Sequence, residues 1–388
     1  MTVDVTTHKS LSNNSVDRAA EILLSPNASN TERTSAQNLV NEWRASFSIP
    51  LRCVFNQVRV STRDFRSDII CSRRLKRMES IITKLKRPEM QHMKLSRMHD
   101  IGGCRAIFPE FYSLAEFRKL RESELKKITA YVGSSDYIGS PKPDGYRGVH
   151  LIVHPVFKNP RYAIWNTRRI EIQIRTRLQH AWATTVESVD MFNSENLKVG
   201  RGDPKWRRFF ALCSSVIALQ EEAPIVPDTS RNEKELAREI SQLATDLDPF
   251  LKMQGWKVAL EAIDRVNVDR TPLESSRKKG GWKVALKAKF GLNAEGKVNV
   301  ARNPTIALVT VDIEKMQVFM DTFSNDELET ANDQYTFIEE QIRNGRKAHT
   351  FLVALNQMRD LRLAYPNLYA NTEVFTYNIT RFLRYNGY

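Results

Sequence analysis

One stretch of the chain alternates strictly between apolar and polar side chains. In RIEIQIRT, residues 169–176, isoleucine occupies positions 170, 172 and 174, and the polar residues Glu171, Gln173 and Arg175 follow them in turn. A period of two predicts a β-strand with one face in a core. The polar face has two interpretations at this point: an ordinary solvated surface, or a functional surface that holds a carboxylate, an amide and a guanidinium in a row.

Three further stretches predict strands. They are CRAIF (104–108), the stretch 129–138 that ends in SSDYI, and VHLIVHPV (149–156), an apolar run typical of a central strand. Apolar residues at helical spacing predict helices over the ranges 34–47, 54–63, 113–127, 177–192, 209–219 and 231–250. The first 250 residues therefore combine strands with helices.

Residues 72–86, SRRLKRMESIITKLK, also show helical spacing. The apolar residues that share one helical face are Leu75, Met78, Ile81, Ile82 and Leu85. We predict an amphipathic helix whose basic side holds Arg74, Lys76 and Lys84. That side is either solvated or a cationic wall that faces polyphosphate.

The last third of the chain changes character. Strands are predicted at 305–313, 316–319 and 349–355, and helices at 326–343 and 371–384, which together make a compact α+β module. The module shows no clustered catalytic residues, so we expect it to serve binding, regulation or assembly. We divide the chain into a flexible N-terminal segment with one short amphipathic helix (1–30), a main domain (31–222), a helical and basic connecting region (223–295) and the C-terminal module (296–388).

Composition limits the class of protein. The chain has 388 residues, of which 41% are hydrophobic, enough for cores in two or three domains. No apolar run reaches the roughly 18 residues that span a bilayer, and the polar N-terminal sequence lacks the apolar stretch of a secretory signal. The four cysteines are widely spaced, which argues against a zinc ribbon or a disulfide scaffold. We expect a cytoplasmic protein that does not act in a membrane.

Positive charge is concentrated in two regions of the chain. Of the net charge of +14, residues 52–105 contribute +9 (14 Lys or Arg against 5 Asp or Glu), and residues 270–302 contribute +7 (9 against 2). Concentrated positive charge predicts phosphate-bearing partners, either nucleotides or nucleic acid. For the second region, a solvated basic face is an equal alternative.

Two carboxylates and one loop indicate nucleotide chemistry. Asp100 precedes the strand CRAIF and Glu171 lies on RIEIQIRT; two carboxylates on neighbouring strands can hold a Mg²⁺ ion that bridges phosphate oxygens. In the loop SPKPDGYRG, two prolines and an Asp-Gly turn present Lys142, Tyr146 and Arg147. Cations beside an aromatic ring suit the phosphates and the base of a nucleotide. This combination indicates a transferase that acts on two nucleotides.

Four motifs then occur in the order of a known family. They are RLKRMESIITKLK, HDIGGCRAIF, DYIGSPKPDGYRGVHLIV and EIQIRTRLQHAW, over roughly residues 40–200. The set resembles the synthetase domain of the RelA/SpoT alarmone synthetases, of the stand-alone type with an extra C-terminal domain. The resemblance implies an α/β (α+β) fold, in which a mixed β-sheet flanked by helices is related to nucleotidyltransferases. It also implies Mg²⁺-dependent transfer of the β,γ-pyrophosphate of ATP to the 3′-hydroxyl of GDP or GTP, with release of AMP.

The resemblance assigns roles to individual residues. It places Arg74, Lys76 and Lys84 on the phosphates of ATP, and Arg105 on the adenine. Asp100 and Glu171 would hold Mg²⁺, and Glu171 would also accept the proton of the 3′-hydroxyl. The residues that it places around the acceptor are Lys142, Tyr146 (stacked on the base), His150, Gln173, Arg175, His180 and Glu187.

The sequence departs from the family pattern at several positions. Ser135 precedes the Asp-Tyr pair where the family often has lysine, Asp144 stands where the turn usually has asparagine, and Ser188 follows Glu187 where the family has histidine. Fewer cations around the acceptor leave the choice between GDP and GTP open. Too few histidines are grouped for the metal-dependent hydrolase half of the family, so alarmone breakdown is not expected.

Two hypotheses about the acceptor follow. The first is a stand-alone synthetase of guanosine tetra- or pentaphosphate. The second is a toxic relative that pyrophosphorylates the 3′ end of tRNA and is restrained by its C-terminal module or by a partner. The basic region 270–302 motivates the second hypothesis, because tRNA needs phosphate contacts beyond the pocket. The sequence leaves open whether the chain forms a homo-oligomer and whether a regulatory partner binds the C-terminal module.

Overall fold

A computed structural model describes most of the chain, and the structural statements below concern the residues it describes. They are residues 11–88, 92–192, 202–254, 282–287, 293–299, 305–312, 317–346, 348–354 and 368–388. The chain divides into two compact units, the first made of residues 1–180 and 217–227, the second of 181–216 and 228–388. The chain thus leaves the first unit after His180 and returns to it briefly, a division that differs from the segments predicted above.

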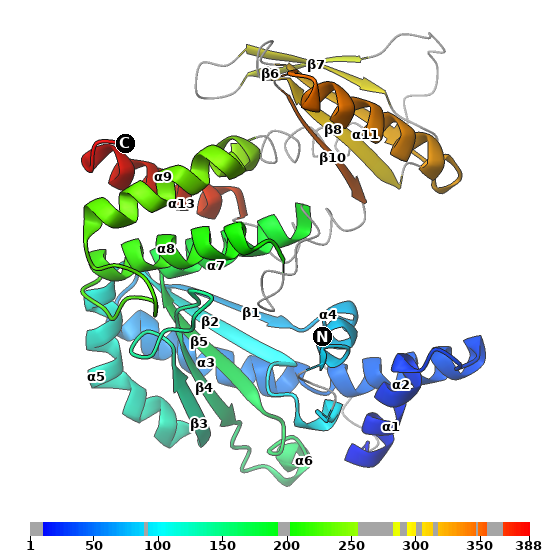
Figure 1. Cartoon of the computed structure of the whole chain (residues 1–388). Coiled ribbons are helices and arrows are strands. Elements are labelled where there is room, and N and C mark those ends of the chain that lie inside the picture. The colour runs from blue at the N-terminus through cyan, green and yellow to red at the C-terminus, as the bar shows by residue number, and fades with distance from the viewer. Residues whose placement is uncertain are drawn as a thin grey trace. The chain divides into compact units, whose positions relative to one another are not determined.

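The first unit consists of a five-stranded sheet with helices around it (Figure 1). Its elements are α1 (Asn13–Leu24), α2 (Asn30–Ala45), α3 (Ser48–Phe65), β1 (Ile70–Leu75), α4 (Met78–Leu85), the 3₁₀ turn Leu95–Arg97, β2 (Gly102–Phe108), α5 (Phe111–Ile128), β3 (Ala130–Asp136), β4 (Val149–His154), α6 (Pro160–Ala163), β5 (Ile170–Thr176) and the first turn of α7 (Arg177–Phe192). The strand order is β1-β2-β5-β4-β3, with β2 and β5 parallel and the other neighbours antiparallel. The mixed sheet flanked by helices is therefore confirmed.

One face of this sheet is buried in the hydrophobic core of the first unit. The isoleucines at positions 170, 172 and 174 are completely buried, as the alternation in β5 predicts. Helices α3 and α5 pack against this face and contribute Leu51, Val54 and Phe117 to the same cluster. Because β-strand side chains alternate between faces, burial of the isoleucines turns Glu171 and its neighbours toward the opposite face.

Helix α1 is the short amphipathic helix predicted within residues 1–30, of which residues 1–10 lie outside the described part of the chain. Ser12 caps the helix by accepting a hydrogen bond from the backbone N–H of Ser15. Val16 and Ala20 are buried in the same core as the sheet. The short amphipathic helix is thus confirmed, and it belongs to the folded unit.

The predicted helix over residues 72–86 is wrong in its first half. Residues Ile70–Leu75 form the edge strand β1, antiparallel to β2, and only Met78–Leu85 is helical. Leu75 fitted the helical spacing of the residues that follow it, but pairing with β2 decides its backbone, since tertiary contacts override local periodicity. Arg74 therefore lies on a strand, Lys76 follows the strand, and Lys84 is on the helix α4.

The second unit contains helices and a second five-stranded sheet. Its elements are the rest of α7, α8 (Pro204–Gln220, whose last turn belongs to the first unit), α9 (Glu233–Leu247), β6 (Trp282–Lys287), β7 (Asn293–Asn299), β8 (Ile306–Asp312), β9 (Gln317–Phe323), the 3₁₀ turn Asn325–Glu327, α11 (Leu328–Arg343), β10 (Ala348–Ala354) and α13 (Leu368–Tyr385). The strand order is β10-β8-β9-β7-β6. The strands and helices predicted after residue 304 are confirmed, whereas β6 and β7 were not predicted.

Helix α13 packs with the other helices of this unit. The Phe375 ring lies 5.9 Å from that of Phe210 on α8, and α13 also contacts α9. Most of the basic region 270–302 lies outside the described residues, which here include only β6 and β7. No helix in the described part of the chain combines the length and the apolar composition needed to cross a bilayer.

Candidate active site

The face of the first sheet opposite the core gathers polar side chains from three strands. On the parallel strands β2 and β5, Gly103 is the partner of Glu171 and Arg105 is the partner of Gln173. On the antiparallel strand β4, His150 is also a partner of Gln173. Residues that are partners in register lie on the same face, so the sheet places an arginine, a histidine, a carboxylate and an amide side by side.

Glu171 is held by two hydrogen-bond donors. Its Oε1 is 2.9 Å from His150 Nδ1, and its Oε2 accepts a 2.6 Å hydrogen bond from Gln173 Nε2. Burial opposes ionisation of Glu171, but its hydrogen bonds with His150 and Gln173 outweigh burial and hold the pKa of Glu171 below its ordinary value. Glu171 is therefore an ionised carboxylate with a fixed orientation.

A chain of hydrogen bonds continues from Glu171 to the acceptor loop, residues 140–148. His150 Nε2 lies 2.5 Å from the Tyr146 hydroxyl, to which the guanidinium of Arg175 also donates. Burial raises the pKa of Tyr146, which keeps its hydroxyl protonated. With a proton on His150 Nδ1, every group finds its partner: Arg175 donates to Tyr146, Tyr146 to His150, and His150 to Glu171.

Two cations and a second aromatic ring surround Tyr146. The Arg175 guanidinium lies 4.9 Å and the Lys142 ammonium 5.4 Å from the centroid of the Tyr146 ring. Tyr137 packs edge-on against Tyr146 at 5.7 Å, and Lys142 lies 4.3 Å from the Tyr137 ring. The predicted pairing of a cation with an aromatic ring on this loop is thus present. Sequence reasoning gave Tyr137 no role, although its place in the motif DYIG could have suggested one.

Asp100 lies between two lysines. Its Oδ2 is 2.8 Å from Lys76 Nζ and its Oδ1 is 3.0 Å from Lys84 Nζ. Burial alone would raise the pKa of Asp100, but the two ammonium groups lower it to about 2. Lys76 is brought there because its backbone N–H donates to the carbonyl of Ile101 at 2.7 Å, which extends the β1–β2 pairing by one step.

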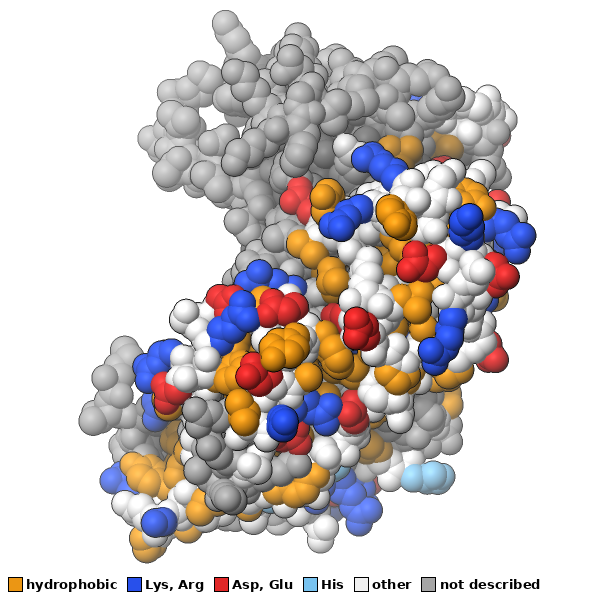
Figure 2. Space-filling view, turned by 90° about the vertical axis from the view of Figure 1, so that its left-hand side faces the viewer, with side chains coloured by type: hydrophobic (Ala, Val, Ile, Leu, Met, Phe, Trp, Pro, Cys, Tyr) orange, Lys and Arg blue, Asp and Glu red, His pale blue; other side chains and the backbone are white. Residues whose placement is uncertain are grey.

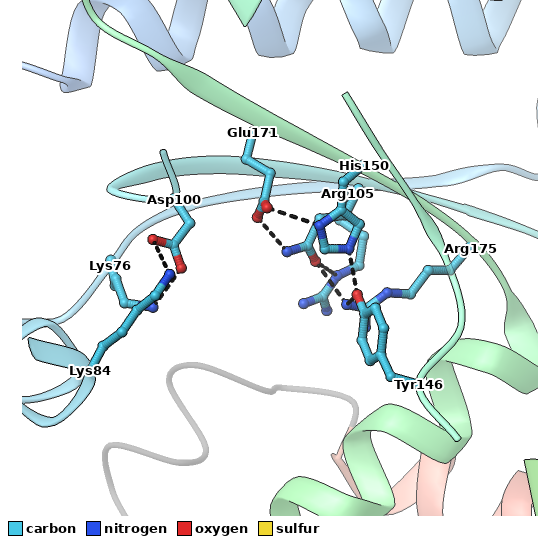
Figure 3. Close-up of polar contacts among 9 residues, drawn as sticks. Lys76, Lys84, Asp100, Arg105, Tyr146, His150, Glu171 and Arg175 are labelled. Carbon is cyan, nitrogen blue, oxygen red and sulfur yellow. Dashed lines mark hydrogen bonds and ion pairs between the residues drawn. The ribbon is translucent and has the colours of Figure 1, made fainter. Parts of the chain in front are cut away.

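The two carboxylates face the same space. In Figure 3, Asp100 with its lysines lies on one side of Glu171, and His150, Tyr146 and Arg175 lie on the other. The charge of Asp100 raises the pKa of Glu171, so the two groups are close enough to interact electrostatically. The site thus has a lysine-rich side and an aromatic side, with Glu171 between them.

The remaining predicted residues divide into two groups. Arg105 donates to Gln173 Oε1 at 3.4 Å and lies 3.5 Å from His180 Nδ1, which joins both residues to the polar face. Glu187, in contrast, lies two turns further along α7, in the second unit. Arg74 is exposed on β1 as the partner of Gly103, hence on the same face as Glu171.

Comparison with known proteins identifies this part of the chain. Residues 73–194 match the family described as "Region found in RelA / SpoT proteins". The GTP pyrophosphokinase YwaC of Bacillus subtilis is 36% identical over 119 residues, which cover 29% of this chain and 52% of that protein. The GTP pyrophosphokinase YjbM of the same organism is 32% identical over 126 residues, which cover 32% of this chain and 57% of that protein.

Among solved structures, the chain is similar to the small alarmone synthetase 1 from Bacillus subtilis bound to its product pppGpp. The TM-score is 0.37 and the identity 23%, over 47% of this chain and 93% of that one. The matched segments span little more than half of the two GTP pyrophosphokinases. The family match includes Asp100, the acceptor loop and Glu171, so the polar face described above lies in the part of the chain, residues 73–194, that matches the RelA/SpoT region.

Proposed function

We propose that the chain is an ATP-dependent pyrophosphotransferase that moves the β,γ-pyrophosphate of ATP to the 3′-hydroxyl of GDP or GTP. The observation that carries the proposal is the arrangement around Glu171, an ionised carboxylate with a fixed orientation. The two lysines that pair with Asp100 lie on one side of it, and a tyrosine, a histidine and an arginine lie on the other side. Two nucleotides that react with each other need two such sides. The GTP pyrophosphokinases that match the region support the same chemistry.

The donor nucleotide belongs on the lysine-rich side. Lys76, Lys84 and Arg74 supply positive charge for the triphosphate, whose negative charge spreads over its oxygens in the transition state. In the absence of nucleotide, Asp100 pairs with both lysines and keeps them next to Glu171. Arg105, next to Gln173 and His180, is the residue proposed for the adenine.

The acceptor nucleotide belongs on the aromatic side. Tyr146 stacks on its base, and Lys142 and Arg175 lie where they can meet its phosphates. Its 3′-oxygen attacks the β-phosphorus of ATP, the bond from that phosphorus to the bridging oxygen of the α-phosphate breaks, and AMP leaves with the electron pair. The hydroxyl proton passes to Glu171, which has lone pairs besides the two that accept from His150 and Gln173.

Asp100 and Glu171 are the residues that would hold a Mg²⁺ ion. Mg²⁺ is usually held by one or two carboxylates, with the rest of its shell supplied by phosphate oxygens and water. Asp100 and Glu171 interact electrostatically and provide that donor set; within the described residues, no group of three or more His, Cys, Asp and Glu forms a complete site. When bound, the ion would neutralise charge on the transferred phosphates.

Product analysis tests the proposal. The full chain is incubated with Mg²⁺ and γ-labelled ATP in three reactions, with GDP, with GTP or with tRNA, and the labelled products are separated. Label on GDP or GTP, absent for Glu171→Gln, is the expected result. Label on none of the three acceptors would overturn the proposal, and label on tRNA alone would replace it with the tRNA-modifying alternative.

The tRNA alternative depends on positive charge outside the site. On the face of the described chain in Figure 2, basic side chains alternate with acidic ones and form no continuous basic surface. The net charge of +14 nevertheless favours a polyanionic partner. We prefer GDP and GTP as acceptors because Tyr146, with Lys142 and Arg175 beside its ring, offers an aromatic ring and cations suited to one nucleotide.

A further inference from the structure

Arg147 follows Tyr146 in the acceptor loop but turns away from the site. Its side chain is only 2% exposed, which makes it one of the largest fully buried side chains of the described chain. One guanidinium nitrogen donates to the carbonyl of Pro224 at 2.6 Å, and another is 3.5 Å from the carbonyl of Ile138. The prediction that the loop presents Arg147 to a nucleotide, together with Lys142 and Tyr146, is therefore wrong.

A buried carboxylate, Glu221, comes from the segment that returns to the first unit. Its Oε1 accepts from the Thr176 hydroxyl at 2.5 Å and its Oε2 accepts from Gln179 Nε2 at 2.7 Å. Thr176 ends β5 and Gln179 lies in the first turn of α7. These two residues also bond to each other, because each backbone N–H donates to the side-chain oxygen of the other. Glu221 is thus fixed to the end of the strand that carries Glu171.

The two buried groups compensate each other electrically. Burial lowers the pKa of Arg147 to about 10, and the charge of Glu221 acts in the opposite direction. Burial raises the pKa of Glu221, against which Thr176, Gln179 and Arg147 act. The geometric link between them is the returning segment itself: Arg147 donates to the carbonyl of Pro224, three residues after Glu221, and Glu221 accepts from Thr176 and Gln179. The described mechanism uses neither side chain.

We propose that Arg147 and Glu221 form a brace that fixes the acceptor loop to the end of β5, and thereby sets the position of the acceptor nucleotide. Both ends of the brace are next to residues of the site: Arg147 follows Tyr146, and Thr176 follows Arg175. Arg147 and Glu221 are positioning residues, since neither belongs to the polar face. This inference rests on the proposed function for its kinetic part only.

The first test measures loop order without any turnover. Hydrogen exchange of the peptide that covers residues 137–148 is followed by mass spectrometry in the full chain and in Glu221→Gln, which removes the charge at nearly constant size. We expect exchange about tenfold faster in the variant, because local opening becomes easier when the brace loses a charge. Exchange at the wild-type rate would overturn the brace.

The second test separates positioning from general destabilisation. Glu221→Gln should raise the KM for the acceptor about tenfold and leave the KM for ATP within about twofold, since only one substrate is misplaced. Equal increases in both KM values would overturn the assignment to the acceptor. If the wild-type chain transfers no pyrophosphate, the proposed function fails, while the exchange measurement still decides on the brace.

Two further variants serve as controls. Asp17 is another buried carboxylate of the first unit, and it accepts two 2.8 Å hydrogen bonds from Ser96. Asp17 lies on α1, far in the sequence from the residues of the polar face. Asp17→Asn should lower thermal stability without changing loop exchange or either KM. If Glu221→Gln does not fold, Arg147→Lys replaces it, because a lysine keeps the charge but lacks the planar fork whose two nitrogens reach two carbonyls. Unchanged loop exchange in Arg147→Lys would contradict the proposal.

Discussion

The two sheets of this protein share a pairing pattern and differ in their side chains. Read from β1, the neighbours in the first sheet pair antiparallel, parallel, antiparallel and antiparallel; read from β6, the second sheet repeats this order. In β5, polar residues alternate with buried isoleucines, whereas in β8 the successive residues from Ala307 to Thr310 are all at most 3% exposed. Similar backbone pairing therefore carries a candidate site in the first sheet, and among the described residues of the second sheet we assign none.

The difference shows where function resides. Strand pairing determines which positions become neighbours, and the residues at those positions determine the chemistry. Gln173 and Arg105 meet because β2 and β5 pair in this register, yet we can assign no catalytic role to the described residues of the parallel pair β7 and β9. Matched variants in the two sheets can test whether only the first sheet contributes to catalysis.

The largest expected effect is the loss of turnover in Glu171→Gln. Removing a general base costs about 10²- to 10⁴-fold in rate, and the amide keeps the shape of the side chain. The matched change in the second sheet is Thr310→Val, which removes a buried hydroxyl that lies 3.0 Å from the Thr350 hydroxyl. Initial rates of pyrophosphate transfer should fall for the first variant only; an equal fall for both would make the contrast between the sheets meaningless.

A smaller effect concerns acid stability. The folded pKa of Asp100 is about 2, below its ordinary value of 3.8, so its ion pairs stabilise the fold fully above pH 3.8 and are lost as the pH falls toward 2. The shift corresponds to about 2 kcal/mol of unfolding free energy. Urea unfolding between pH 5 and pH 2 should therefore show a steeper loss for the wild type than for Asp100→Asn. Parallel curves would show that the two lysines do not stabilise the ionised carboxylate.

The smallest effect concerns a glycine at the end of the acceptor loop. Gly148 has a φ of +148°, and a Cβ there would lie 3.1 Å from Arg175 Cγ, so alanine strains the backbone and displaces Arg175. We expect about a tenfold weaker acceptor affinity for Gly148→Ala, from loss of one well-placed cation. Gly133→Ala on β3 is the control, because nothing lies within 4 Å of its added Cβ. Titration with GDP distinguishes the two, and equal affinities would remove Arg175 from the acceptor site.

Local patterns in the sequence predicted those features that depend on one segment. The alternation in RIEIQIRT correctly gave the strand, its buried isoleucines and the shared face of Glu171 and Gln173. The loop chemistry around Asp144 gave a turn, in which that carboxylate accepts from the backbone N–H of Tyr146 at 2.9 Å.

Features that depend on distant segments were not predictable in this way. Whether Leu75 continues a helix or ends a strand is decided by β2, which lies some thirty residues further along the chain. The direction of Arg147 is decided by the carbonyl of Pro224, which accepts from its guanidinium. No local pattern reveals that the acceptor of a loop arginine lies on a segment that follows residues 181–216 of the other unit.

The insertion of residues 181–216 between the two parts of the first unit has a consequence for the newly made chain. The strands of the first unit are complete at Thr176, but the segment with Glu221 follows only after residues 181–216, which belong to the second unit. At typical translation rates, the interval between synthesis of His180 and Pro227 lasts roughly 2 to 10 s. During that interval a nascent chain holds Asp100 and Glu171 but lacks the segment of the proposed brace. A shortened version that ends at residue 194, where the family match ends, would lack that segment permanently.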